Sequence, residues 1–331
     1  MRPITYSRAA DAAGAITTVS ADPTSDFLAG GTTEIDLLRQ NVLTPRRLVD
    51  INDLPLTGVD EAPDGGVRIG ALARMSEVAA SPLVRERFPA VSQALEAGAS
   101  PQLRHMASMG GNLLQRVRCP YYRDAVSPCN RREPGTGCSA LEGFSRGHAV
   151  LGTSEHCIAT HPSDVAVALA ALDARVHTSS GRGEQAYSID DFFLTPGHTP
   201  HREHPLEHGE LITAIEVPSA PVARRSVYLK VRDRESYEFA LVSAAGALSL
   251  VDGTIADVRL ALGGVGTKPW RADRAEGVLL GATAGRDSFA EAAHVEMAGA
   301  RTTTHNAFKV ELAQRVIVRV LETLTANGSS S

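Results

Sequence analysis

The sequence predicts an α+β fold in which two small subdomains precede a separate C-terminal domain. Short apolar runs that end in glycine alternate with helical patterns over the first 218 residues, which is typical of mixed strand and helix layers. The last hundred residues instead begin with three strand-like runs in succession and end with two long helical patterns. A chain of 331 residues is long enough to bury two or three separate cores.

Changes in these patterns delimit the units. We predict a first subdomain over residues 1–60, a second over 61–218 and a C-terminal domain over 222–325. An irregular segment without usable periodicity, rich in proline, glycine, arginine and cysteine, interrupts the second subdomain at 116–158; a stretch of this kind inside a compact domain is normally functional or disordered. Residues 326–331 are predicted to be a disordered polar tail.

The first two subdomains alternate helical patterns with strand-like runs. Helices are expected at 9–16, 34–40, 75–80 and 90–98, and strands at 27–29, 47–51 and 67–71. After the irregular segment, Ser163 is a good N-cap for a helix with Asp164 in its first turn. Strands are then expected at 175–177, 185–189 and 211–217.

The C-terminal domain is predicted to be a meander followed by helices. Strands are expected at 227–231, 240–250 and 255–262, with Asp252-Gly253 as the hairpin turn before the last strand. Helices are expected at 286–300 and 306–324, and an apolar stripe runs along the second of them.

Composition and charge argue against several classes of partner. A net charge of −5 and a pI near 6.1 disfavour binding to nucleic acid or to an anionic membrane. No apolar run approaches the roughly 20 residues that span a bilayer. The N-terminal residues show no signal-peptide pattern and the arginine pairs lie far inside the chain, so we expect synthesis in the cytoplasm and, for any export, attachment to another chain.

A predicted strand is joined to a predicted helix by Phe27-Leu28-Ala29-Gly30-Gly31-Thr32-Thr33-Glu34. Such a turn exposes successive backbone N–H groups, and glycine lets a ligand approach the backbone closely. A concavity of N–H donors suits a diphosphate. The G-G-T-T sequence matches neither the dinucleotide-binding fingerprint nor the Walker loop, so on its own the turn is more often a plain connection.

All the cysteines of the chain lie close together, at Cys119, Cys129, Cys138 and Cys157. This clustering indicates that they act together. Disulfides would suit an exported protein, but no signal-peptide pattern is present. A structural zinc site usually contains a tight C-x2–4-C pair, whereas nine, eight and eighteen residues separate these cysteines. A 4Fe–4S cluster accepts irregular spacing, so spacing alone favours zinc and the cluster equally.

A second glycine turn occurs at Ala107-Ser108-Met109-Gly110-Gly111-Asn112-Leu113. The motifs A-G-G-T and S-M-G-G-N-L, with His161-Pro162-Ser163-Asp164 before an apolar helix, resemble the FAD-binding subunit of the xanthine dehydrogenase family of molybdenum hydroxylases. The likeness is greatest to the flavin subunits of periplasmic aldehyde oxidoreductases and extends over nearly the whole chain. It implies a two-subdomain FAD-binding domain of the PCMH/vanillyl-alcohol-oxidase type and a C-terminal domain of the CO dehydrogenase flavoprotein type.

The resemblance is most specific around the cysteines, in C-P-Y-Y, P-C-N-R-R and G-T-G-C-S-A-L-E-G. These segments look like the part of such flavin subunits that carries a 4Fe–4S cluster. The resemblance therefore implies a cluster with four thiolate ligands, Cys119, Cys129, Cys138 and Cys157. Because this segment is inserted between two flavin-contacting segments, we expect the cluster to lie beside the flavin.

The resemblance also implies which residues hold FAD. The backbone of residues 27–34 and the hydroxyls of Thr32 and Thr33 would wrap the diphosphate. Glu34 departs from the usual apolar residue, and we expect its carboxylate to point away. The second half of the cradle would be formed by Ser108, Gly111 and Asn112.

Three further residues are expected at the flavin. Asp164 would bind ribityl hydroxyls, Ile158 would pack against the isoalloxazine ring, and Lys230 would approach the flavin edge. The histidines between residues 198 and 208 are interpreted as part of a surface loop, because prolines interrupt any shared face. No constellation typical of a general base or a nucleophile was found, which is expected where a flavin performs the redox chemistry.

The resemblance implies an electron-transfer subunit of a molybdenum-dependent aldehyde oxidoreductase. A molybdopterin-binding large subunit would oxidise the aldehyde, and a small subunit with 2Fe–2S clusters would pass electrons to this chain and on to an acceptor other than NAD. A heterotrimer in the periplasm, reached by co-export with a signal-bearing partner, is expected; a cytoplasmic location is the alternative. The alternative functions are a flavin subunit of the xanthine dehydrogenase or hydroxybenzoyl-CoA reductase type and, from a different class, a zinc-stabilised binding module.

Overall fold

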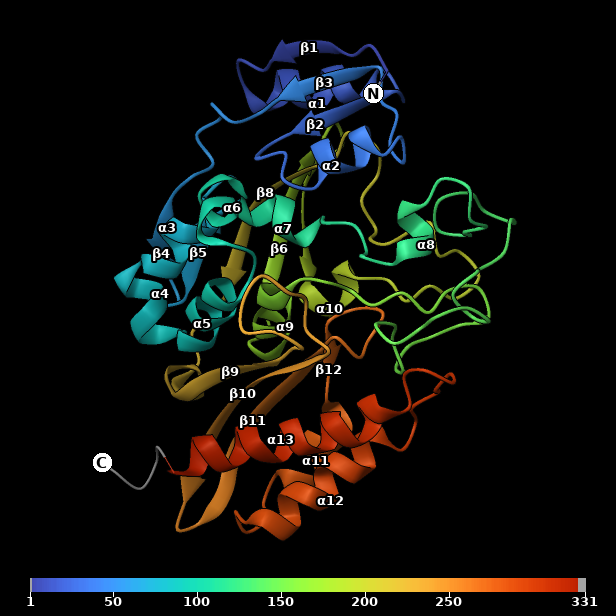
Figure 1. Cartoon of the computed structure of the whole chain (residues 1–331). Coiled ribbons are helices and arrows are strands. Elements are labelled where there is room, and N and C mark those ends of the chain that lie inside the picture. The colour runs from blue at the N-terminus through green and yellow to red at the C-terminus, as the bar shows by residue number, and fades with distance from the viewer. Residues whose placement is uncertain (1, 327–331) are drawn as a thin grey trace.

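Three sheets follow one another through the molecule in the order of the chain (Figure 1). The computed structural model describes residues 2–326, and the tail predicted to be disordered lies outside the described residues from 327 onwards. The mixture of helices with separate sheets confirms the predicted α+β class.

The first sheet is parallel and has the strand order β1-β3-β2. Its elements are β1 (Thr5–Arg8), α1 (Ala12–Ser20), β2 (Ser25–Leu28), α2 (Glu34–Arg39) and β3 (Arg47–Asp50). The helix predicted at 9–16 was placed too early, because the side chain of Asp11 caps α1 by accepting a hydrogen bond from the Gly14 N–H group at 2.7 Å. Residues before that cap extend along β3 instead.

The second sheet is antiparallel, with the order β4-β5-β8-β6-β7. Its strands are β4 (Val59–Glu61), β5 (Val67–Gly70), β6 (Arg175–Ser180), β7 (Gly183–Ser188) and β8 (Leu211–Val217). The predicted subdomain boundary between residues 60 and 61 therefore falls inside β4.

Short helices surround this second sheet. They are α3 (Met75–Ala80), α4 (Pro82–Arg87), α5 (Pro89–Ala97), α6 (Pro101–Met106), α7 (Met109–Leu113), α8 (Pro120–Arg123), α9 (Asp164–Ala171) and α10 (Ile189–Phe192). Proline occupies the first turn of α4, α5, α6 and α8, where its missing N–H group costs nothing and where it separates one helix from the next. Helix α9 is buried along its whole length.

The C-terminal sheet is antiparallel, with the order β12-β11-β10-β9. After a 3-10 turn, η1 (Pro221–Arg225), its elements are β9 (Ser226–Val231), β10 (Val242–Val251), β11 (Thr254–Gly263), β12 (Trp270–Arg271), α11 (Asp273–Leu279), α12 (Arg286–Met297) and α13 (Phe308–Ala326). The hairpin turn lies where it was predicted, and both Asp252 and Gly253 have the positive φ that such a turn requires. Helices α11–α13 lie together on the C-terminal sheet, at the end of the molecule opposite β1 (Figure 1).

The second and third units share a hydrophobic core, whereas the first sheet packs around a separate one. Ala245 and Ala261 of the C-terminal sheet belong to the same buried cluster as α5 and α9, so the second and third units share apolar packing. The first sheet has its own smaller core, which includes Leu72 and Leu211 of the second subdomain, and Leu37 of α2 packs in a further cluster with the cysteine segment. The junction between the first subdomain and the rest is therefore where a cavity can open.

Candidate functional site

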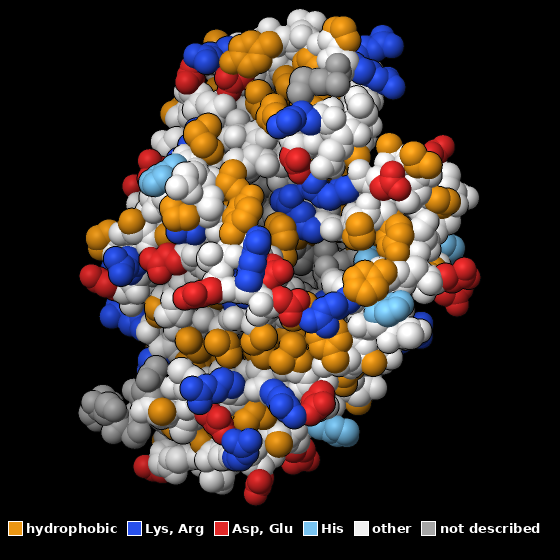
Figure 2. Space-filling model, viewed as in Figure 1, with side chains coloured by type: hydrophobic (Ala, Val, Ile, Leu, Met, Phe, Trp, Pro, Cys, Tyr) orange, Lys and Arg blue, Asp and Glu red, His pale blue; other side chains and the backbone are white. Residues whose placement is uncertain are grey.

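A cavity of about 810 Å³, called the large cavity below, lies at this junction. Both glycine turns line it, together with residues of α5, α9 and the segment after β9. Figure 2 shows a hollow below the N-terminal lobe in which basic side chains gather. Two arginines that follow the second glycine turn, Arg116 and Arg118, line the cavity.

The first glycine turn requires its glycines. A Cβ atom at Gly30 would lie 1.9 Å from the carbonyl oxygen of Met106, and Gly31 has a φ of +68°. The backbone of this turn therefore packs directly against the end of α6, which precedes the second glycine turn. Arg74 supports the contact by donating hydrogen bonds to the Met106 carbonyl at 2.6 Å and to the Asn52 side chain at 2.9 Å.

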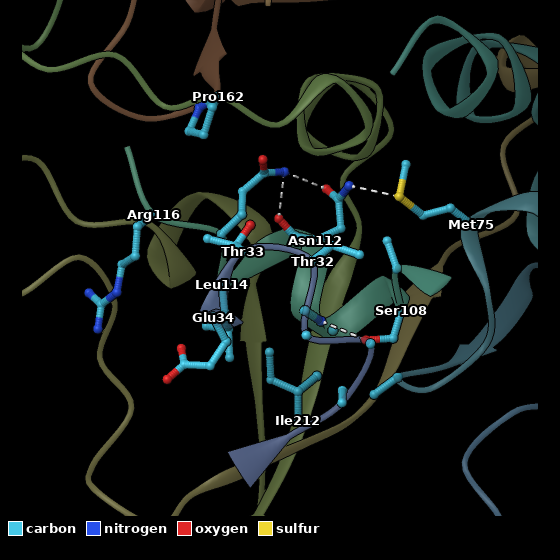
Figure 3. A pocket seen from close by; sticks show the side chains of 18 of the residues that line it. Thr32, Thr33, Glu34, Met75, Ser108, Asn112, Leu114, Arg116, Pro162 and Ile212 are labelled. Atoms are coloured by element: carbon cyan, nitrogen blue, oxygen red, sulfur yellow. Dashed lines mark hydrogen bonds between the residues drawn. The ribbon is translucent and has the colours of Figure 1, made fainter. Parts of the chain in front are cut away.

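The second glycine turn is held by side chains that can be followed in Figure 3. The Ser108 hydroxyl accepts a hydrogen bond from the Gly111 N–H group at 3.3 Å. The side chain of Asn112 lies 2.5 Å from the Ser163 hydroxyl that caps α9, and its amide nitrogen lies 3.2 Å from the sulfur of Met75. The turn and the start of α9 are therefore fixed relative to each other.

Glu34 begins α2 at the edge of the cavity. Figure 3 shows its carboxyl group pointing away from Asn112 and Ser108. Burial and, to a smaller extent, the nearby Asp26 raise the pKa of this carboxyl group to about 7, against the opposing charge of Arg116. Its Oε1 atom is buried without a hydrogen-bond partner.

Asp164 and Lys230 both line the cavity and form an ion pair, with 2.8 Å between Lys230 Nζ and Asp164 Oδ2. The other carboxylate oxygen accepts a hydrogen bond from the Tyr228 hydroxyl at 2.5 Å. Burial and the Asp164 charge raise the pKa of Tyr228 well above its usual value, so this hydroxyl stays protonated. The charge of Lys230 is thus compensated within the chain, and Tyr228 is a member of the site that sequence analysis missed.

The predicted flavin residues mostly come together. The cavity is lined by Phe27, Ala29, Gly30, Gly31, Thr32, Thr33, Glu34, Ser108, Gly111, Asn112, Asp164 and Lys230. Leu28 and Ile158 do not line it. Strand alternation turns Leu28 to the face opposite Phe27, and Ile158 is buried where its carbonyl group accepts a hydrogen bond from Ala149.

A buried carboxylate joins the large cavity to the cysteine segment. Glu203 forms ion pairs with Arg116 at 2.6 Å and with Arg131 at 2.7 Å. Arg131 also points a guanidinium nitrogen at the Cys157 sulfur, 3.7 Å away. In the predicted surface loop, His198, His201 and His208 are exposed, whereas His204 stacks on Phe192 and the Glu203 side chain is only 12% exposed.

All four cysteines border one small cavity next to α8. They are free thiols, and Cys129 and Cys138 face each other across an isolated β-bridge. Burial is the largest influence on Cys119 and Cys138, raising the pKa of Cys119 to about 12 and also raising that of Cys138. Thiols of this kind ionise when a metal replaces their protons.

The surroundings of these sulfurs suit thiolate ligands. Backbone N–H groups of Tyr121 and Tyr122 point at Cys119, and three others point at Cys138. His148 Nε2 lies 3.2 Å from the Cys119 sulfur. Donors directed at sulfur stabilise the negative charge that a thiolate ligand carries.

No metal centre is formed in the described part of the chain. Across residues 2–326, no three Cys, His, Asp or Glu side chains are grouped closely enough to hold a metal ion. None of the helices in the same range combines the length and apolar character that a bilayer crossing requires.

Two family models together account for nearly the whole chain. Residues 2–220 match the FAD binding domain in molybdopterin dehydrogenase, and residues 227–324 match the CO dehydrogenase flavoprotein C-terminal domain. The chain is 47% identical to the aldehyde oxidoreductase FAD-binding subunit PaoB of Escherichia coli, over 97% of this chain and 98% of the relative. It is 30% identical to the glyceraldehyde dehydrogenase medium chain of Sulfolobus acidocaldarius, over 83% and 80%.

Solved structures agree on the fold. Quinoline 2-oxidoreductase from Pseudomonas putida 86 superposes with a TM-score of 0.75 at 23% identity, covering 98% of both chains. CO dehydrogenase from Oligotropha carboxidovorans gives 0.76 at 22% identity, covering 98% of this chain and 99% of the other. With the two glycine turns on one cavity and both family models matched, the chain belongs to the FAD-binding subunits of the molybdenum hydroxylase family, within its aldehyde oxidoreductase branch.

Proposed function

We propose that this FAD-binding subunit transfers electrons within an aldehyde oxidoreductase and carries a 4Fe–4S cluster on its four cysteines. The observation that carries the proposal is that all four cysteines border one cavity, which Arg131 also lines. Glu203 forms ion pairs both with Arg131 and with Arg116, which lines the large cavity. Two cofactors held by one buried network would be close enough to exchange electrons.

FAD would occupy the large cavity. It supplies reversible uptake of one or two electrons. The backbone of residues 30–33 and the turn at Ser108–Asn112 would bind the diphosphate, where glycine leaves room for close approach. Asp164 would accept hydrogen bonds from ribityl hydroxyls, and its ion pair with Lys230 would hold the carboxylate in place.

The cysteine cavity would hold the cluster through Cys119, Cys129, Cys138 and Cys157. The cluster supplies one-electron transfer. Arg131, beside Cys157, and the N–H groups directed at Cys119 and Cys138 would favour the more negative reduced form and so raise its potential. His148 would orient the Cys119 sulfur.

The names of the relatives support a set of partner subunits. Related chains are named medium chains of glyceraldehyde dehydrogenase and carbon monoxide dehydrogenase, which indicates smaller and larger companions. We propose a heterotrimer with a 2Fe–2S small subunit and a molybdopterin-binding large subunit that oxidises an aldehyde and water to a carboxylic acid, two protons and two electrons. Those electrons would pass through this chain to an acceptor other than NAD, in a periplasmic complex exported with a signal-bearing partner.

Purification of the tagged chain from its own host tests this assembly. We expect two companion chains in mass spectrometry, molybdenum in the complex, and flavin absorption together with a broad iron–sulfur shoulder. Flavin absorption without molybdenum or companions would contradict the heterotrimer. Fractionation of the same cells would separate the periplasmic location from the cytoplasmic alternative.

A further inference from the structure

Five arginines lie between residues 116 and 132, and one of them is bound differently from the rest. Arg116 and Arg131 are paired with Glu203, and Arg123 with Asp36. Arg132 donates to the backbone carbonyl groups of Tyr121, Tyr122 and Ser127. Neither Arg118 nor Arg132 has a carboxylate within ion-pair distance in the described part of the chain, and of these two only Arg118 lines the large cavity.

Arg118 is held by neutral groups at the wall of the large cavity. One of its terminal nitrogens donates to Thr33 Oγ1 at 3.0 Å and to Gln115 Oε1 at 3.4 Å. Its guanidinium lies over the Phe239 ring, 4.8 Å from the centroid. Its Nε atom is buried without a hydrogen-bond partner. Arg118 is partly buried, and the carboxylate that acts on it electrostatically, Asp36, is already paired with Arg123. A partly buried cation at a cavity wall without a carboxylate of its own is suited to an anion supplied by a ligand.

The contact with Thr33 places this charge at the first glycine turn. Because Arg118 donates to Thr33 Oγ1, the threonine hydroxyl proton is free to be donated elsewhere. Arg118 and Thr33 together therefore offer a positive charge and an O–H donor beside the backbone of Gly30 and Gly31. A guanidinium offers several N–H donors in a planar array, a geometry that matches phosphate oxygens.

We propose that Arg118 is the counter-ion of the FAD diphosphate. The inference rests on the assignment of the glycine turns to the diphosphate made above. An anionic reduced flavin ring is the other negative group that FAD could bring to Arg118, but the hydrogen bond to the glycine turn favours the diphosphate. The two anions differ in one testable respect, since the diphosphate is charged in both redox states of the flavin and the ring is charged only when reduced.

The test is a titration of the flavin-stripped full chain with FAD, in which flavin fluorescence reports binding. A second titration uses ADP, which carries only the diphosphate end, as a competitor. Arg118→Gln should raise the Kd for oxidised FAD at least about tenfold and weaken ADP in the same proportion, because a charge-assisted hydrogen bond is lost. Arg39→Gln, which removes an exposed charge from the neighbouring α2, should leave the Kd within about twofold.

Arg118→Lys provides a second test in case the neutral variant does not fold. It keeps the charge but loses the planar fork, so its Kd should rise less than that of a neutral variant yet above that of the unmodified chain. An unchanged Kd for FAD in Arg118→Gln, or in Arg118→Lys if the first variant does not fold, overturns the inference about Arg118. The proposed function is tested separately, because it stands as long as the unmodified chain binds FAD. A lower flavin midpoint potential with an unchanged Kd for oxidised FAD would assign Arg118 to the flavin ring and overturn the diphosphate role.

Discussion

The large cavity and the cysteine cavity are built in opposite ways. The large cavity is lined by turns at the ends of regular elements, and steric fit requires its glycines, so its shape exists before a ligand arrives. The cysteine cavity lies in a segment whose only helix is the single turn α8, and it is held by arginines bonded to carbonyl groups and to Glu203. The large cavity is therefore shaped by backbone geometry, whereas the cysteine cavity depends on side-chain links.

Removing the link between the two regions should have the largest effect on stability. Glu203→Gln leaves Arg116 and Arg131 without their shared carboxylate, and loss of one partner in a buried ion pair costs about 3 kcal/mol or more. Urea unfolding of the full chain measures this. Glu207→Gln is the matched control, because its ion pair with Arg182 is exposed and should contribute less than about 1 kcal/mol. Equal losses in the two variants would contradict the account of Glu203.

Gly30→Ala should damage the flavin region and leave the cysteine region intact. The added Cβ atom would lie 1.9 Å from a backbone oxygen, and overpacking of this kind costs about 1–3 kcal/mol. We expect lower FAD content with unchanged iron content in the purified protein. Gly277→Ala, inside α11 where a Cβ atom meets open space, should keep full FAD content. Normal FAD retention in Gly30→Ala would show that the turn does not contact the nucleotide.

Glu34 should make the stability of the flavin-free chain depend on pH. Its folded pKa of about 7 lies above the ordinary 4.5, so its contribution is fully present below pH 4.5 and is lost as the pH rises through 7. Glu34→Gln should therefore melt like the unmodified chain at pH 5 and be more stable at pH 8, by about 2 kcal/mol or less. Parallel melting curves for the two proteins across this range would contradict the raised pKa.

Cys129→Ser should change the cysteine region alone, with little effect on the folding of the metal-free chain. Loss of one thiolate ligand should lower iron content and weaken electron transfer to the acceptor, while FAD remains bound because Cys129 does not line the large cavity. Iron analysis and flavin absorption of the purified variant measure both. Full iron retention would remove Cys129 from the ligand set.

The two regions also differ in how far sequence predicts them. Glycine turns have a local steric cause, so their residues could be identified. The fifteen helices and strands predicted from residue 27 onwards also start within two residues of an observed element. Tyr228 and Glu203 could not be found in this way. Their partners, Asp164 and Arg131, are distant in the chain, and no local pattern shows which buried hydroxyl or carboxylate will meet them.

The arginines illustrate the same limit. Sequence shows that five of them crowd one segment, but only the structure shows that three are paired with carboxylates and that, of the other two, Arg118 lines the large cavity and Arg132 does not. Likewise, the family resemblance implied that Ile158 packs against the flavin ring, but its side chain is buried and does not line the large cavity. Local patterns predict which residues are near a site, whereas tertiary packing decides which of them face it.

The central claim is that one chain holds both a flavin and an iron–sulfur cluster, and cofactor stoichiometry of the purified, anaerobically prepared chain tests it most directly. We predict one FAD and four iron atoms per chain, with acid-labile sulfide equal to the iron. A chain that contains one FAD but no iron, or zinc in place of iron, would contradict the cluster and leave only the flavin site.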